Sequence, residues 1–457
     1  MTQSLSFVGK VYDKLVSISI GICAFTFFID WRFLNVRNIG WLFEGANSDK
    51  AQAYLGWEFF RRSEWSIPLG RNESFGLFPN NSISYSDSIP LLALIFKAFK
   101  GFLGGPFQYF GIWLLICFIL QSLFANLIAS QFTQNVFVHI WSSFLSVTLP
   151  FFLERTPIHL ALSGHFLILA GIYLSLRPEK SKMFFVWMLL LQCSILIHPY
   201  LSAMLFIIYL TKFVYIFILD VDRRFLVMVQ GITILLSIAL TSYYVLGIST
   251  GVYSTTNTNH YGTNPWNLLS IFNPRDWPKI LSFYPSANSG FETFSYLGLG
   301  VLVLIGIVFV LCLRNPRFFL LVCKSKIHLF SAISILLLFA ITHRVGIGNF
   351  RFVLFENSYI ESQLSIFRAS ARMAWPFLYT LLFFGIFCLV KFIKKNTLFI
   401  VISVCLMLQG LDIKSAPEFL FPKNIVSYSA FGPNIEQKWK NIPVGYKELL
   451  VLQNQKD

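Results

Sequence analysis

Long apolar runs separated by short basic loops constrain this sequence more than any other feature. A helix needs about 20 consecutive apolar residues to cross the hydrocarbon core of a bilayer. Eleven runs approach that length, and we expect each to form a transmembrane helix. Their approximate ranges are 14–33, 106–127, 136–153, 158–176, 183–197, 200–219, 225–247, 293–313, 327–342, 373–391 and 396–411. The sequence therefore predicts an all-α polytopic membrane protein.

The composition argues against an ordinary soluble domain. Charged residues make up only 12% of the chain and hydrophobic residues 56%, whereas soluble domains carry about 25% charged residues. The formal net charge of +15 comes mostly from Lys and Arg between apolar runs, where these residues act as topology signals. No basic arm or motif indicates a nucleic-acid partner. The seven cysteines show no disulfide or metal-binding spacing.

The positions of the cations predict how the chain is oriented. With the N-terminus in the cytoplasm, the basic loops also fall inside, as the positive-inside rule requires. These loops are 177–182, 223–224, 314–326 and 391–395. We expect the first span to be uncleaved, because no small-residue cleavage site follows it. The same alternation predicts an extracytoplasmic C-terminus.

One apolar segment, 89–105, does not fit this alternation as a span. Counting it would move every later basic loop outside, so we predict a helix in the membrane interface with Lys97 and Lys100 reaching the headgroups. The topology then comprises one transmembrane domain, residues 1–411, and a short external C-terminal tail, 412–457. Three long external segments are about 34–105, 248–292 and 343–372.

The first external segment carries an aromatic, amphipathic run after Asp49. Tyr54, Trp57, Glu58 and Arg61 recur at helical spacing, which predicts a juxtamembrane helix. We expect its aromatic side chains to anchor it in the interface. The expected anchors are Trp57, Phe59, Phe60 and Trp65.

Ionisable residues gather on the predicted external side. Such side chains are costly near a bilayer unless they are paired or functional. Their clustering therefore predicts a single wet, extracytoplasmic cavity. The candidates are Asp49, Asp87, Arg155, His159, His165, His198, Glu292, Arg368 and Arg372.

Most of these candidates also have a purely structural interpretation. Asp49 and Asp87 precede predicted helices and would serve as N-caps. Arg155 and His159 lie four residues apart on one helix face and would anchor a span at the headgroups. His165 lies deeper and would pack among the helices or line the cavity.

Arg368 and Arg372 are also four residues apart, at the start of a span. They would either snorkel towards the headgroups or bind an anionic ligand such as a phosphate, which paired guanidinium groups suit. The chain has no Walker-type phosphate loop, no HExxH and no GxSxG. The residues alone therefore identify no catalyst and no metal site.

Six blocks resemble, in the same order, a family of uncharacterised bacterial inner-membrane proteins that is grouped with the GT-C glycosyltransferases. The early blocks are SDKAQAYLGWEFFRRSEWSIPLG, NSISYSDSIPLLALIFK and ERTPIHLALSGHFLILAGIYL. The later blocks are NLLSIFNPRDW, FETFSYLGLG and FRASARMAWP. The resemblance covers about residues 40 to 380, and the blocks are specific as a set.

This resemblance implies a GT-C-like fold with about eleven transmembrane helices and juxtamembrane helices in a long first external loop. It implies location in a bacterial inner membrane. The implied activity is inverting transfer of a hexose or pentose from a polyprenyl-phosphate donor to a glycan, lipid or protein acceptor outside. No cofactor is specified, although a divalent metal is compatible with the superfamily. The alternatives are a lipid-glycan flippase or transporter and a non-catalytic membrane scaffold.

The resemblance also implies roles for individual residues. Asp49 matches the acidic residue of the first loop that acts as base or positions the acceptor, and Asp87 is the second catalytic candidate, in the DSIPL block. The residues expected to bind the donor phosphate or substrate are Arg155, His159, His165, His198, Glu292, Arg368 and Arg372. This chain departs from the family pattern at Thr293 and Ala371, where the family tends to have Gly, and at Lys50–Tyr54, where it often has a His.

Overall fold

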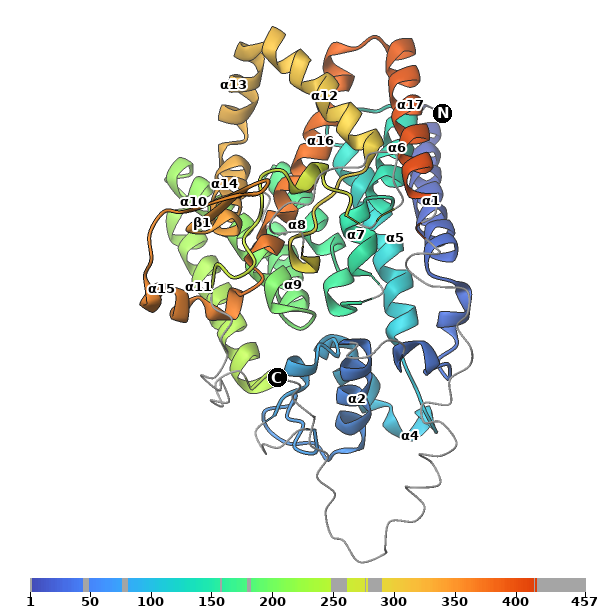
Figure 1. Ribbon diagram of the computed structural model, residues 1–457, viewed down its shortest axis with the longest axis vertical. Helices are drawn as coiled ribbons and strands as arrows, with labels where there is room; N and C mark the ends of the chain where they lie inside the picture. Colours follow the sequence, from blue (N-terminus) through green and yellow to red (C-terminus); the bar gives the residue numbers. More distant parts are fainter. Residues whose placement is uncertain are drawn as a thin grey trace, which may run out of the picture.

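The computed structural model describes residues 2–43, 49–75, 81–156, 158–178, 182–247, 261–275, 277, 290–414 and 416. Within these residues the chain is predominantly helical, as the sequence predicts (Figure 1). Most of the predicted C-terminal tail, 412–457, and much of the predicted second external segment, 248–292, lie outside the described residues.

Each of the eleven ranges predicted to span a membrane contains a helix. A helix satisfies its backbone polar groups within the segment, so it suits runs of apolar residues in a bilayer. The helices are α1 (Thr2–Phe28), α5 (Phe110–Ala129), α6 (Val136–Val147), α8 (Phe166–Leu176), α9 (Met183–Ile195), α10 (Pro199–Leu219), α11 (Arg224–Leu240), α12 (Leu299–Arg314), α14 (Ile327–Ile341), α16 (Trp375–Phe392) and α17 (Lys395–Ile413).

The helices differ in whether their length suits a membrane span. Within the described chain, six helical segments are long and apolar enough to cross a membrane. They lie in α1, α5, α10 and α17 and, together with short adjoining helices, in α11 and α16. A seventh is obtained if α12 is counted together with α13 (Pro316–Ser325), which is bent from it by 103°. The other four, α6, α8, α9 and α14, are shorter apolar helices. These features identify a multi-pass membrane protein.

The short helices end where non-helical segments enter the bundle. α8 has only 11 residues and follows the largely irregular segment 156–165, while α14 has 15 residues and ends at a β-hairpin. Irregular backbone inside a membrane protein is stable only where protein buries it or it lines a wet cavity. These non-helical segments carry polar residues. From the hydropathy pattern alone, the segments cannot be distinguished from the spans beside them.

Close backbone contacts hold pairs of helices together. A Cβ atom added at Gly21 of α1 would lie 2.6 Å from the Ile119 Cα of α5, and one added at Gly300 of α12 would lie 2.0 Å from the Cys405 carbonyl oxygen of α17. Small residues allow this approach, which favours dispersion contacts between helices. The α12–α17 contact also buries Asp412, whose carboxylate accepts the Leu299 N–H at 3.0 Å. The predicted boundary at 411 therefore falls inside α17.

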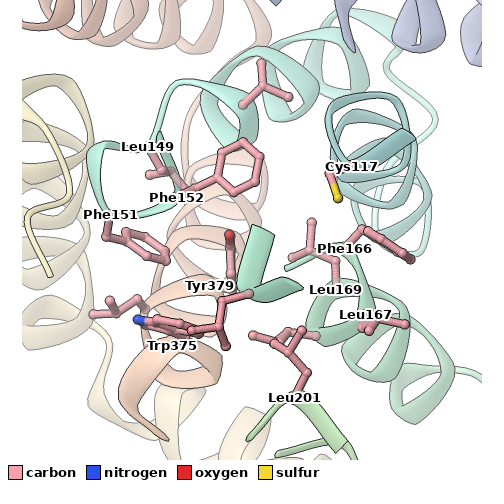
Figure 2. Packing of buried hydrophobic residues seen from close by; sticks show 14 of the residues in the cluster. Cys117, Leu149, Phe151, Phe152, Phe166, Leu167, Leu169, Leu201, Trp375 and Tyr379 are labelled. Atoms are coloured by element: carbon pink, nitrogen blue, oxygen red, sulfur yellow. The ribbon is translucent and has the colours of Figure 1, made fainter. Parts of the chain in front are cut away.

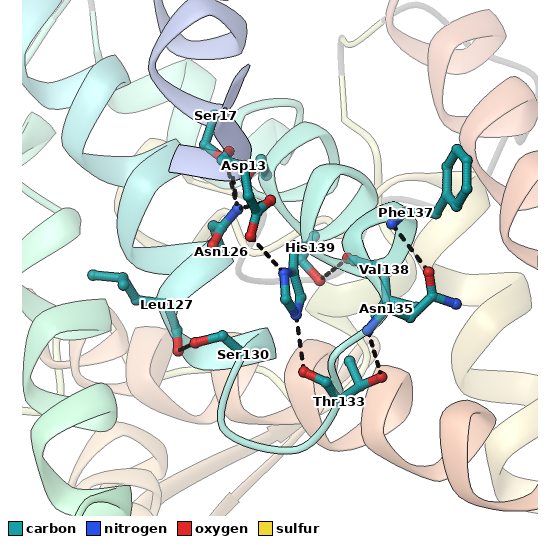
Figure 3. A network of polar contacts seen from close by, with 12 residues as sticks. Asp13, Ser17, Asn126, Leu127, Ser130, Thr133, Asn135, Phe137, Val138 and His139 are labelled. Atoms are coloured by element: carbon teal, nitrogen blue, oxygen red, sulfur yellow. Dashed lines mark hydrogen bonds and ion pairs between the residues drawn. The ribbon is translucent and has the colours of Figure 1, made fainter. Parts of the chain in front are cut away.

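A buried polar network joins α1, α5 and α6, as Figure 3 shows. His139 Nδ1 lies 2.7 Å from Asp13 Oδ2, and its Nε2 lies 3.0 Å from the Thr133 carbonyl oxygen. Asn126 donates to the same Asp13 carboxylate at 2.9 Å. Buried polar groups need such partners, because an unpaired group loses its hydration without compensation.

The segment predicted to be the first external one contains a compact unit of α2 (Asp49–Arg62), α3 (Pro90–Ala98) and α4 (Lys100–Leu103) at one end of the molecule (Figure 1). Trp57 and Phe60 are fully buried in it, so the prediction that they anchor the helix in the membrane interface is wrong. Trp57 Nε1 donates to the Phe107 carbonyl at 2.9 Å. Only Phe59 and Trp65 keep large exposed surfaces, of 42% and 45%.

Lys97 of α3 corrects a second prediction for this unit. Its side chain does not reach outwards: the residue is 1% exposed, and its Nζ donates to Ser63 Oγ at 3.0 Å. The ammonium group lies 3.9 Å from the centre of the Phe60 ring. A cation over an aromatic face is stabilised in the absence of water, which explains why this lysine is buried. Lys100 remains exposed.

A two-stranded antiparallel hairpin, which the sequence analysis does not anticipate, follows α14. It consists of β1 (Arg344–Ile347) and β2 (Phe350–Val353), with Ile347 paired to Phe350. The turn uses Gly348 at φ 58°, a conformation that glycine adopts without strain. Asn267 exchanges two hydrogen bonds with Gly348 and thereby connects the second and third external segments.

We predict that Gly300→Ala lowers the free energy of unfolding by about 1–3 kcal/mol, because the new methyl group overpacks the α12–α17 contact. The matched control is Gly306→Ala on the same helix, where an added Cβ meets no atom within 4 Å. Thermal unfolding of the two purified variants in detergent measures the difference. Equal transition temperatures would contradict this account of the contact.

Candidate functional site

The turn that carries Asp87 packs closely against α2, which carries Asp49. Gly56 of α2 allows this contact, since a Cβ there would lie 2.1 Å from Ser86 Oγ. Ser88 Oγ donates to the Ala53 carbonyl at 2.6 Å. The two carboxylates predicted as catalytic are therefore held on one compact unit.

Asp87 occupies a left-handed backbone conformation, with φ 54° and ψ 26°. Asp tolerates this region better than most residues. The N-cap of α3 is Ile89, and Asp87 forms no capping hydrogen bond, so the interpretation of Asp87 as the cap of this helix is wrong. Its side chain keeps 41% of its surface accessible. Asp87 is thus a solvent-accessible carboxylate whose position is set by the turn and not by a hydrogen bond to the start of α3.

His159 lies between two carboxylates. Its Nδ1 approaches Asp49 Oδ2 to 2.8 Å, as an ion pair without an aligned hydrogen bond, and its Nε2 lies 3.6 Å from Glu292 Oε1. Burial alone would lower the pKa of His159, but the two carboxylates outweigh it and raise the pKa above 6.5. The ring is therefore held towards its charged form, which makes it a cation of the site rather than a free base.

Glu292 forms the strongest contacts of the site. Arg372 binds it with both arms, with Nε–Oε2 and Nη2–Oε1 distances of 2.7 Å. Arg155 Nη1 lies 3.4 Å from the same carboxylate. Burial favours the neutral acid, but His159, Arg372 and Arg155 together hold the pKa of Glu292 well below its usual range. Glu292 is therefore an anion that gathers three cationic side chains.

Arg155 is fully buried, so the interpretation that it anchors a span at the headgroups is wrong. It ends α7 (Pro150–Arg155) and donates to the Phe291 carbonyl, and its guanidinium lies 4.0 Å from the centre of the Phe291 ring. Its neighbour Glu154 is paired with Arg275 at 3.0 Å. These contacts fix the segment that carries Glu292, which gives Arg155 a positioning role.

His198 faces Asp87 from the start of α10. Its Nδ1 accepts the Tyr200 N–H at 3.1 Å, so its proton resides on Nε2, which lies 3.5 Å from Asp87 Oδ1. Burial and the nearby Arg372 lower the pKa of His198 well below 6.5. His198 is therefore a neutral N–H donor directed at an accessible carboxylate.

The two arginines of FRASAR differ in their surroundings. Glu292 neutralises Arg372, whereas Arg368 is exposed and its guanidinium forms no hydrogen bond or ion pair within the described structure. Neighbouring protein atoms displace part of the water around the half-accessible Asp87 side chain and raise its pKa, while the charges of His159, Arg372 and Arg368 act in the opposite direction. Arg368 is thus close enough to Asp87 to act on it electrostatically and remains available for a ligand.

Tyr200 organises this arginine segment and was not among the residues that the sequence predicts for the site. Its hydroxyl accepts the Ala369 N–H at 3.1 Å and donates to the Ile366 carbonyl at 3.3 Å. The Arg372 guanidinium lies 5.1 Å from the centre of its ring. A tyrosine at the end of an apolar run gives no sequence signal for this role; the proximity of His198 is the only indication.

His165 does not belong to the site. Its ring is fully buried in the helical core, 4.2 Å from the Trp375 ring, and its Nδ1 lies 2.9 Å from the Tyr379 hydroxyl. Figure 2 shows Trp375 and Tyr379 among the surrounding apolar side chains, including Phe151 and Phe152. Of the two interpretations of His165, packing is therefore the one that the structure supports.

The described residues contain no group of three His, Cys, Asp or Glu side chains placed to hold a metal ion. The carboxylates face histidine and arginine side chains instead. What the site offers chemically is an accessible carboxylate, Asp87, near an accessible guanidinium, Arg368, supported by the paired charges around Glu292.

A family model described as a domain of unknown function, DUF6311, matches residues 18–414. The chain belongs to this DUF6311 family. The matched range includes every predicted site residue, from Asp49 to Arg372. No curated protein and no solved structure matches the chain. The DUF6311 domain thus contains the whole candidate site, and its chemistry has to be inferred from the side chains.

We predict a pH-dependent contribution of His159 to the stability of this DUF6311 protein. Because the folded-state pKa is raised, the stabilisation is complete below the unfolded value of 6.5 and is lost as the pH rises through the folded value. His159→Gln should therefore cost about 1.5–3 kcal/mol near pH 6 and less near pH 9. Chemical unfolding across this pH range measures the difference between variant and wild type.

His198→Gln serves as the matched control for this measurement. The lowered pKa of His198 keeps the folded ring neutral over this range, whereas the unfolded ring gains a proton below about pH 6.5. The cost of His198→Gln should therefore rise from pH 6 to pH 9, opposite to that of His159→Gln. A His159→Gln effect that stays constant or also rises with pH would rule out the charged imidazole.

Proposed function

We propose that this protein is a GT-C-type glycosyltransferase that moves a sugar from a polyprenyl-phosphate donor to an acceptor at the extracytoplasmic face, with inversion. The observation that carries the proposal is the accessible Asp87 carboxylate, with the neutral His198 N–H directed at it, in a group of ionisable side chains that includes the exposed Arg368. Residues from distant parts of the chain converge here, although packing alone would not require their charges. Such a concentration of perturbed ionisable groups is typical of active sites.

The contacts favour Asp87 over Asp49 as the general base. The resemblance points to Asp49, but Asp49 is already paired with the His159 ring. Among the described residues Asp87 has the long contact to neutral His198 as its ion-pair contact, and desolvation by the surrounding protein raises its pKa. A base whose pKa is moved towards the working pH is more effective. Asp49 then holds the His159 ring in place and has a positioning role in the site.

The proposed reaction is a direct displacement at the anomeric carbon. The Asp87 carboxylate takes the proton of the acceptor hydroxyl, and the acceptor oxygen forms the new bond to the anomeric carbon. The bond from that carbon to the phosphate oxygen breaks, and polyprenyl phosphate leaves with the electron pair. Arg368 stabilises the charge that develops on the leaving phosphate, which is commonly a large contribution in such reactions.

We propose that the chain crosses the membrane of a bacterial cell eleven times, with the N-terminus in the cytoplasm. The long helices and the bent α12–α13 pair would supply seven crossings, and the shorter α6, α8, α9 and α14 the other four. The unit of α2 and α3 then covers the outer ends of the helices. A donor with a long lipid chain reaches such a site from within the bilayer.

We predict that Asp87→Asn reduces glycan product by about 100-fold or more, because a general base contributes that much to a proton transfer. Asp49→Asn should cause a smaller loss. The measurement is the surface glycan profile, by mass spectrometry, of cells that lack the native copy and express each variant at equal protein level.

The control is Glu64→Gln, a carboxylate of the same external unit whose side chain is 93% exposed. Full activity of Asp87→Asn would exclude Asp87 as the base. If both aspartate variants, separately and combined, kept full activity, a transporter or scaffold would replace the transferase.

We also predict that Arg368→Gln weakens donor binding by about ten-fold or more, as expected for loss of a charge-assisted contact to phosphate. Arg368→Lys should recover part of this loss, because a lysine keeps the charge but not the two-armed geometry. Binding is measured with purified protein and polyprenyl phosphate, the part of the donor that Arg368 is proposed to contact. Arg62→Gln, an exposed arginine on α2, is the control; an equal effect of both substitutions would contradict a specific role for Arg368.

A further inference from the structure

A cavity of about 390 Å³ lies at the end of the helical bundle opposite to α2 and α4. It is enclosed by the C-terminal parts of α5, α8 and α16 and by the adjoining parts of α13 and α14. Figure 1 shows α13 at the end of the molecule opposite to α2 and α4, and none of the candidate site residues lines the cavity. The cavity therefore belongs to a different region from the residues discussed above.

Most residues that line the cavity are apolar, and several are aromatic. Five phenylalanines line it, namely Phe132, Phe330, Phe383, Phe384 and Phe387. An apolar cavity of this kind is not stabilised by water, which finds too few hydrogen-bond partners there. Its surface suits a hydrocarbon chain.

The same cavity also has polar and basic lining residues. Ser325 and Lys326 line it where α13 meets α14, and the Lys326 ammonium has no hydrogen bond or ion pair within the described structure. Thr380 also lines the cavity, and its hydroxyl is buried without a hydrogen-bond partner among the described residues. No acidic residue is among the lining residues. The cavity thus combines an apolar interior with an unneutralised cation at one side.

The surroundings add more positive charge. Arg314, Arg317 and Lys324 lie on or beside α13, and Arg177 lies between two lining residues, Leu176 and Pro178. Basic pockets between helices at the membrane surface bind anionic lipid headgroups. The charge pattern therefore favours an amphiphile with an anionic head over an uncharged apolar molecule.

We propose that this cavity binds one anionic glycerophospholipid, with an acyl chain among the phenylalanines and the phosphate at Lys326. The bend of 103° between α12 and α13 turns the chain back towards α14, and Val322 and Ser325 of α13 form one wall of this lipid site. The bound lipid connects α13 and α14 to α5, α8 and α16. This site is separate from the proposed transferase site and does not depend on it.

The test uses the full-length protein in nanodiscs of phosphatidylcholine, with and without phosphatidylglycerol. Native mass spectrometry after release into detergent counts the retained lipids. We expect one retained phosphatidylglycerol per wild-type protein and a preference over phosphatidylcholine that falls about five-fold in Lys326→Gln. Lys324→Gln, which removes an equal charge just outside the lining, should keep most of the preference.

A second variant tests the apolar part. Ile172→Phe directs a larger side chain into the cavity and should reduce retention of both lipids, while the thermal transition reports whether the protein remains folded. Equal retention of the two lipids by the wild type, or equal effects of Lys326→Gln and Lys324→Gln, would overturn the proposal. If Ile172→Phe does not fold, the comparison of the two lysine variants decides it.

Discussion

The candidate site depends on the interaction of one carboxylate, Glu292, with three cationic side chains. Arg155 and His159 come from one segment of the chain and Arg372 from another, and all three contact it. A buried charge is tolerated only when partners replace its hydration. The Glu292 contacts therefore fix the segments before α8 and before α16 relative to each other, and the positions of the remaining site residues follow from this arrangement.

Residues of the same type have different roles around this centre. Arg372 is neutralised by Glu292, while Arg368, four residues earlier, remains unpaired within the described structure. Asp49 lies against a charged imidazole, while Asp87 faces a neutral one. Arg372 and Asp49 are thus held in ion pairs and help to position the site, whereas Arg368 and Asp87 remain accessible. Which residue positions the site and which can react is decided by its electrostatic environment more than by its type.

The sequence predicts the helices well, because apolar runs and cation positions respond directly to the requirements of a bilayer. It also selects residues that the structure brings together, since an ionisable side chain beside a span needs a reason to be there. It fails where a tertiary contact decides. Lys97 is buried over Phe60, and His165 packs against Trp375. In another fold the same two side chains could have been exposed to solvent. Tyr200 acts through backbone groups, which leave no trace in a side-chain pattern.

The buried charges at the end of α7 have a consequence for how the protein is made. Arg155 and Glu154 find their partners, Glu292 and Arg275, 137 and 121 residues later in the chain. At usual rates of synthesis this distance corresponds to on the order of ten seconds. During that interval two costly charges have no native counter-ions, so they have to wait at the aqueous surface. The segment from α7 to α8 is therefore expected to reach its final depth only after α12 has emerged from the ribosome, which makes insertion of this protein a discontinuous process.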